Sequence, residues 1–167
     1  MTDEIFGEVI DRYTRAQAIT DGLLVDLTEP RFTFREELNI CQEAGIVYPV
    51  AMTAAAFAET IGDDTTGECL VDGQDISGRL WDVLFLFRLA ARRTNSDRFR
   101  FDVLVWDGEK QNPVPLKALC GPGDDGEPVI TILLLGEDCG TATGRVKVGR
   151  GSAAKGARKR LLFPMRL

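Results

Sequence analysis

Hydrophobic and polar positions divide the chain into a helical first half and a strand-rich second half. Two segments each begin with a capping box and end at a glycine: residues 14–17 with Gly22, and residues 33–36 with Gly45. A capping box satisfies free amides at a helix start, and glycine suits the left-handed residue after a helix end, so both patterns predict helices. A third helix is predicted over residues 50–61, between Pro49 and Gly62, because it contains three consecutive alanines.

The fourth predicted helix, residues 76–93, is apolar on nearly every side, which is typical of a central helix. Trp81 and Phe85 lie four residues apart on it, so they share a face, and we expect both in the core. Asp82 follows Arg79 at a spacing that favours a local ion pair over a functional carboxylate.

Strand patterns follow at residues 99–106, 114–119 and 129–135, with a fourth candidate at 23–27. The first alternates with a period of two, and the third is apolar on both faces, which is typical of a central strand. Pro115 favours an edge position or a bulge for the middle strand. The predicted fold class is α+β, with four helices on a small, mainly antiparallel sheet of three to four strands.

The glycines of GPGDDGE, residues 121–127, match the spacing G-x-G-x-x-G of dinucleotide-binding loops. Such a loop needs a helix after it, whereas a strand pattern follows here, and three acids would repel a pyrophosphate. The segment therefore predicts a hairpin turn.

The chain contains no histidine, and none of its three serines lies in a nucleophile motif. Histidine-dependent catalysis and histidine-ligated metals are excluded, and no P-loop motif is present. The four cysteines, which form no C-x-x-C pair, are expected to be free thiols: Cys41, Cys69, Cys120 and Cys139. We expect no cofactor and favour a protein that is not an enzyme.

Carboxylates with a divalent metal are the main chemistry left to an enzyme without histidine. Asp124, Asp125 and Glu127 lie in one turn and offer the oxygen ligands that magnesium or calcium prefers. Their spacing does not match a calcium-binding loop, and acids in turns are usually solvated turn formers. This metal site is the weaker hypothesis.

Charge separates an acidic body, residues 1–138, from a basic tail, residues 139–167. All 26 acids lie in the body with 12 of the 20 basic residues, while the tail has eight basic residues and no acid. The tail's densest basic cluster is Lys155, Arg158, Lys159 and Arg160. These residues suit phosphate contacts with nucleic acid, or a tail that folds back on the acidic body.

No segment is apolar over the roughly 20 residues needed to span a bilayer, and the N-terminus lacks the pattern of a secretory signal. We therefore expect a cytoplasmic protein that does not contact membranes.

Several segments together resemble a family of small bacterial proteins of unknown function that is associated with plasmids, phages and integrated elements. They are IFGEVI (5–10), YTRAQA (13–18), GRLWDVL (78–84), LKA (116–118) and GPGDDGEPVITI (121–132). The resemblance covers about residues 5–138 and implies a mobile-element setting without an established activity.

The acidic body favours a non-enzymatic interaction or regulatory protein with a protein partner. Its acidic surface suits a site built for nucleic-acid phosphates, which points to a nucleic-acid-handling partner. A carboxylate- and metal-dependent enzyme, or a nucleic-acid accessory protein that binds through the tail, are the alternatives.

Overall fold

A five-stranded sheet with the strand order β1-β2-β7-β6-β5 organises the protein. The computed structural model describes residues 13–33 and 38–137. The strands are β1 (Leu24–Asp26), β2 (Val50–Thr53), β5 (Arg98–Trp106), β6 (Gln111–Pro122) and β7 (Pro128–Leu134). β2 pairs with β7 in parallel, and the other neighbouring pairs are antiparallel.

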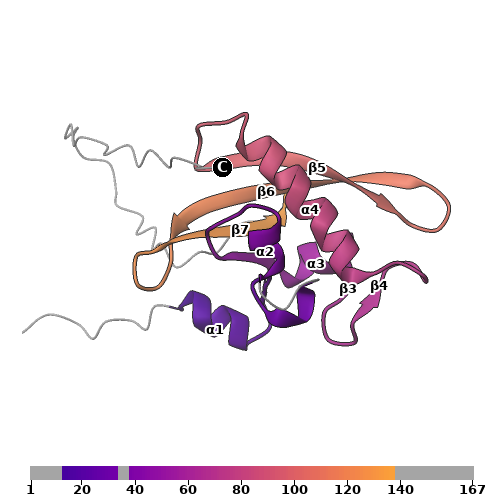
Figure 1. The fold of residues 1–167 in the computed structure, drawn as a ribbon, viewed down its shortest axis with the longest axis horizontal. Coiled ribbons are helices and arrows are strands. Elements are labelled where there is room, and N and C mark those ends of the chain that lie inside the picture. The colour runs from indigo at the N-terminus through magenta and orange to yellow at the C-terminus, as the bar shows by residue number, and fades with distance from the viewer. Residues whose placement is uncertain (1–12, 34–37, 138–167) are drawn as a thin grey trace, which may run out of the picture.

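Four α-helices accompany this sheet within the described residues, and Figure 1 shows the longest, α4, crossing one face of it. They are α1 (Arg15–Thr20), α2 (Ile40–Glu43), α3 (Ala54–Thr60) and α4 (Ile76–Ala91), together with a 3₁₀ turn, η1 (Pro30–Phe32). A small second sheet pairs β3 (Gly62–Asp63) with β4 (Glu68–Cys69). The α+β class is confirmed, but the main sheet is larger than the three to four strands expected. None of the helices within the described ranges has the length and apolarity needed to cross a membrane.

The helix predicted over residues 50–61 is wrong in its first third, which forms the strand β2. Val50, Ala51 and Met52 are fully buried between β1 and β7. A four-residue strand is too short for its sequence pattern to be distinguished from that of a helix. Pairing with β1 and β7 makes this segment a strand. Thr53 ends the strand and caps α3 through a bond from the Ala56 amide to its hydroxyl (3.2 Å).

The helix predicted to begin at Thr33 begins instead at Ile40. Thr33 ends η1, and its hydroxyl donates to the Leu38 carbonyl, while its expected partner Glu36 lies outside the described residues. Asn39 and Gln42 form the capping box of α2, each side chain accepting a backbone amide of the other. By contrast, the capping box at Thr14 and the glycine at the end of α1 are confirmed.

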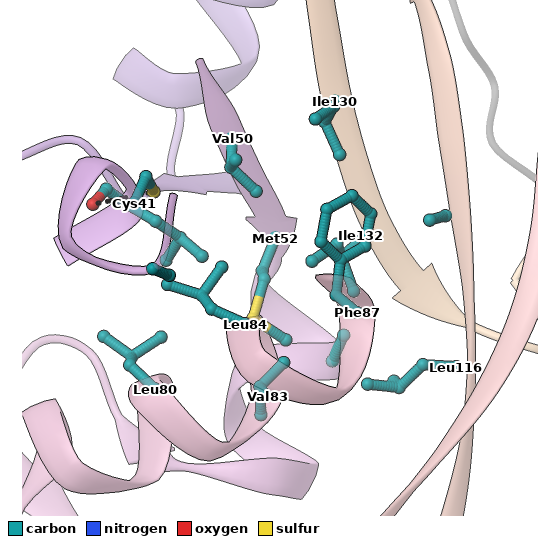
Figure 2. Packing of buried hydrophobic residues seen from close by; sticks show 14 of the residues in the cluster. Cys41, Val50, Met52, Leu80, Val83, Leu84, Phe87, Leu116, Ile130 and Ile132 are labelled. Atoms are coloured by element: carbon teal, nitrogen blue, oxygen red, sulfur yellow. Dashed lines mark hydrogen bonds between the residues drawn. The ribbon is translucent and has the colours of Figure 1, made fainter. Parts of the chain in front are cut away.

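α4 packs on the sheet through one stripe of side chains three and four residues apart. Figure 2 shows this stripe pointing toward β2, β6 and β7. Among the labelled residues are Leu80, Val83, Leu84 and Phe87 of α4 with Val50, Met52, Leu116, Ile130 and Ile132 of the strands. All of them are at most 2 % exposed. Full burial of each side chain contributes about 1.5–3 kcal/mol to folding.

The prediction that Phe85 is a core residue is wrong, because its side chain is 46 % exposed. Trp81 is half-buried and packs against the core from its margin. The two residues do share a face, but that face lies beside the buried stripe. The ion pair between Arg79 and Asp82 is present, with 3.6 Å between Nη1 and Oδ2.

β6 lies inside the sheet and carries Pro115 without a bulge, so the expected edge position is wrong for the strand as a whole. β7 pairs with β6 only from Leu116 onward. Pro115 therefore lies just beyond the paired stretch, where its carbonyl accepts the Leu135 amide (3.1 Å). Because the backbone groups of Pro115 face β7, its lack of an N–H removes no hydrogen bond between β6 and β5.

Candidate functional site

The segment that matches a dinucleotide loop is a hairpin turn between β6 and β7, as predicted. The turn closes through bonds from the Gly123 amide to the Glu127 carbonyl (2.6 Å) and from the Gly126 amide to the Gly123 carbonyl (3.2 Å). β7 begins at Pro128, so no helix follows the glycines, as a dinucleotide loop requires. The start of α1 does contact this turn, but Asp124 of the turn itself accepts its first two amides.

Two carboxylates of this turn bind backbone amides. Asp124 accepts the first two amides of α1, those of Arg15 (2.8 Å) and Ala16 (2.9 Å). Glu127 folds back over the turn, where one oxygen accepts the Asp125 amide (3.0 Å). Within residues 13–33 and 38–137, no three residues of the types that ligate metals gather into a potential metal site. These contacts indicate structural roles: Asp124 joins the hairpin to α1, and Glu127 stabilises the turn itself.

The hydrogen bonds from Ala16 and Arg15 lower the pKa of Asp124 below its ordinary value. A carboxylate with a lowered pKa stabilises the fold at neutral pH, and this contribution is lost as the pH falls through the lowered pKa. We expect Asp124→Asn to lower the free energy of unfolding at pH 7 by about 0.3–1 kcal/mol, because asparagine can accept only one of the two amides and lacks the negative charge that the helix N-terminus favours.

The difference between wild type and Asp124→Asn should narrow below about pH 3.9 and then disappear, as measured by urea unfolding across pH. Asp125→Asn is the control, since it removes the same charge from the same turn without removing a helix cap. A loss that is equal in both variants, or constant with pH, would contradict the capping role.

Three cysteines lie within the described residues, and all are free, as expected. Burial raises the pKa of the Cys41 thiol to about 12. Burial, followed by nearby acidic charge, also raises the pKa of Cys69 and of Cys120. These thiols are protonated at neutral pH and are poor nucleophiles. Cys139 lies outside the described residues.

A groove of about 490 Å³ runs between the β3–β4 hairpin, α3 and the start of β1. We call it the acidic groove. Its walls combine carboxylates with small and apolar side chains: Asp63, Asp64 and Glu68 with Val25, Ala54, Ala58 and Leu70, among others. Leu70 is 44 % exposed. This mixture suits a ligand that is both basic and apolar.

The hairpin that carries these acids is held in place from both sides. The Leu70 amide donates to the Ile61 carbonyl (3.1 Å), which ties the end of β4 to the end of α3. Arg31 donates to the Asp64 carbonyl (3.0 Å) and lies 2.7 Å from its carboxylate. The groove therefore has a fixed wall.

The carboxylate of Asp63 accepts hydrogen bonds from its own turn, and these stabilise its charged form. The hydroxyl and amide of Thr65 and the amide of Thr66 lower the pKa of Asp63. Glu68 is exposed directly opposite Asp63 in the two-stranded sheet. Two like charges on facing strands repel each other, which favours a cationic ligand between them.

The basic cluster of the sequence, Lys155, Arg158, Lys159 and Arg160, lies outside the described residues. Its binding to nucleic acid, or to the acidic body, remains a prediction.

Comparison with known proteins identifies a family of unknown function, DUF6573, whose model matches residues 4–138. The chain belongs to this family. No curated protein and no solved structure matches the chain. The match confirms the expected membership of a family without known function, and it covers the segment over which the resemblance was found. The DUF6573 family has no assigned activity, so a function for this chain has to be inferred from the chemistry of the acidic groove.

Proposed function

We propose that this protein is a non-enzymatic interaction or regulatory protein whose acidic groove binds a basic segment of a protein partner. The observation that carries the proposal is the lining of one groove by several apolar side chains and by Asp63 and Glu68, two carboxylates that form no ion pair with a described residue. Such a groove holds the cationic heads of lysine or arginine at the carboxylates, while their aliphatic stems contact the apolar wall.

A nucleic-acid-handling protein of a bacterial host or rival element is the partner that we propose. Proteins of this kind present basic segments that neutralise phosphates, and a fixed acidic groove competes for those segments. The mobile-element setting rests on the resemblance of the chain to proteins of plasmids and phages. The absence of histidine from the sequence supports a binding role over catalysis.

The groove is tested with the double variant Asp63→Asn/Glu68→Gln in the full chain. Asparagine keeps the side-chain oxygen that accepts from Thr65, so the turn is preserved while two charges are removed. The probe is a short fluorescent peptide of alternating lysine and leucine. Its affinity, measured by anisotropy at low salt, is expected to fall by about twofold to thirtyfold, given about 0.2–1 kcal/mol for each of the two exposed charges.

The control is Asp125→Asn/Glu109→Gln, which removes two charges from turns away from the groove. This control should bind the peptide as wild type does, and the effect of the groove variant should shrink at 1 M salt, where the Debye length is about 3 Å. Equal losses in the two variants would show general charge attraction and would overturn the proposal.

The identity of the partner is tested by affinity capture from host lysate with wild type and both double variants. A nucleic-acid-handling protein that is recovered by wild type and by the control, but lost from the groove variant, supports the proposal. Recovery that does not differ between the variants counts against it.

A further inference from the structure

β5 is a long edge strand with one side open. It is the last strand in the sheet order and pairs only with β6 among the described residues. Its register with β6 continues from Arg98 to Trp106 without a bulge, and the strand contains no proline. Natural proteins usually shorten, interrupt or cover such an edge, because its free backbone groups pair with other strands.

The hydrogen bonds at the two ends of β5 show which backbone groups are free. The Cys120 amide donates to the Asp97 carbonyl, and the Asp107 amide donates to the Lys110 carbonyl. Odd-numbered residues of β5 thus face β6, and even-numbered residues direct both backbone groups to the open side. One of these groups has a partner in the described residues, since Arg79 donates to the Leu104 carbonyl at 3.5 Å.

An apolar groove of about 420 Å³ accompanies this open edge, between β5 and the second half of α4. Leu86 and Leu89 line it from the helix, and Phe99 and Phe101 line it from the strand. The two phenylalanine rings lie 6.4 Å apart, so they present a continuous aromatic wall beside the free backbone groups. Phe101 is already buried, so a strand that joins β5 would mainly cover the exposed parts of Phe99, Leu86 and Leu89.

The charges of β5 indicate which strand joins it. On the face away from α4, Arg100 lies directly opposite Lys117 of β6, and Asp102 lies opposite Pro115. Neither the Arg100 nor the Asp102 side chain forms an ion pair with a described residue. Arg100 therefore has a like charge on its paired side and an empty position on its open side, which favours an acidic neighbour there.

We propose that the open edge binds β5 of a second copy of this chain, antiparallel and across a twofold axis at Phe101. Arg100 of each copy then lies opposite Asp102 of the other, so the contact forms two ion pairs. Phe101 lies opposite Phe101 of the second copy, and the two apolar grooves meet. A twofold contact of this kind closes on itself, so the assembly stops at a dimer.

Charge also selects this register over its neighbours. The free backbone groups belong to even-numbered residues, so the pairing shifts in steps of two residues. A shift one way places Arg100 opposite Arg100, although it also places Arg98 opposite Asp102, and a shift the other way places Asp102 opposite Asp102. Like charges directly opposite each other destabilise both alternatives.

The test uses the full chain and two single variants, Arg100→Asp and Asp102→Arg, with mass measured by light scattering after size-exclusion chromatography. Wild type is expected to be a dimer at micromolar concentration. Each variant alone places like charges opposite each other and should weaken the dimer by at least about tenfold. An equimolar mixture of the two should form a heterodimer, because every facing pair is again of opposite charge.

Two measurements separate this contact from misfolding. Arg100→Asp removes the like-charge pair with Lys117, so at protein concentrations low enough for both proteins to be monomeric its thermal unfolding should occur no lower than that of wild type. In hydrogen exchange monitored by NMR, the amides of Arg100, Asp102 and Leu104 should be protected in wild type and exposed in Arg100→Asp, while Val103 stays protected.

A wild-type chain that is monomeric at 100 µM overturns the proposal, and protection of these amides in such a monomer would assign the edge to another segment of the same chain. A dimer that survives in both single variants also overturns it, because its interface then lies elsewhere. The contact is separate from the acidic groove, so these results leave the proposed function untouched.

Discussion

Replacing Phe87 by alanine is expected to lower the free energy of unfolding by about 3–5 kcal/mol, the usual range for removing a buried aromatic ring. The ring is 1 % exposed, and it contacts two rings of β5, with centroids 5.4 Å from Phe99 and 6.0 Å from Phe101. Alanine leaves a cavity between α4 and the sheet that the surrounding strands cannot fill. Urea unfolding followed by circular dichroism measures the loss.

Phe85→Ala is the matched control, because it removes the same ring from the same helix two residues away. Its side chain is 46 % exposed, so we expect a loss of about 1 kcal/mol or less. If the two variants lost the same stability, α4 would face the sheet through a different stripe.

Replacing Gly62 by alanine is expected to lower stability by roughly 3 kcal/mol and to displace the β3–β4 hairpin. Gly62 has a φ of +151°, a conformation that residues with a side chain rarely adopt. A Cβ atom there would lie 2.0 Å from the Glu68 carbonyl oxygen and 2.8 Å from the Cys69 Cα atom. These are backbone atoms of the facing strand, so the hairpin itself has to move.

Gly67→Ala provides the comparison, because Gly67 also has a positive φ (+75°), but a Cβ atom added there would lie within 4 Å of no other atom. It should cost only about 1–2 kcal/mol, the cost of the left-handed conformation alone. Because Gly62 lines the acidic groove, Gly62→Ala should also weaken binding of the lysine and leucine peptide, whereas Gly67→Ala should not. Equal effects of the two substitutions would show that contact between the strands is unimportant.

Local patterns were sufficient for the elements whose signals lie within a few residues. The capping box at Thr14 positioned α1, because both of its hydrogen bonds join residues three apart. The alternation of β5 identified its buried face, where Phe101, Val103 and Val105 are at most 8 % exposed. Asp125 and Gly126 marked a turn, since a turn depends on the φ values that its own residues tolerate.

The candidate site was not predictable in the same way. Asp124 caps a helix that lies 109 residues earlier at Arg15, and no pattern near Asp124 indicates that partner. The acidic groove joins Val25, Ala54 and Glu68 from three separate segments. The hairpin that forms its wall consists of two-residue strands, which are too short to produce a periodic signal.

The sequence by itself determined the fold class, the positions of α1 and α4, the hairpin of β6 and β7, and the exclusion of histidine chemistry. Each of these depends on residue identity or on spacings of a few residues. The tertiary structure decided that Val50 to Met52 form a strand, that Phe85 faces solvent while Phe87 is buried, and that Asp124 caps α1. The physical reason is that hydrogen bonding and burial at these positions are set by segments distant in the chain, and such partners become neighbours only when the sheet assembles.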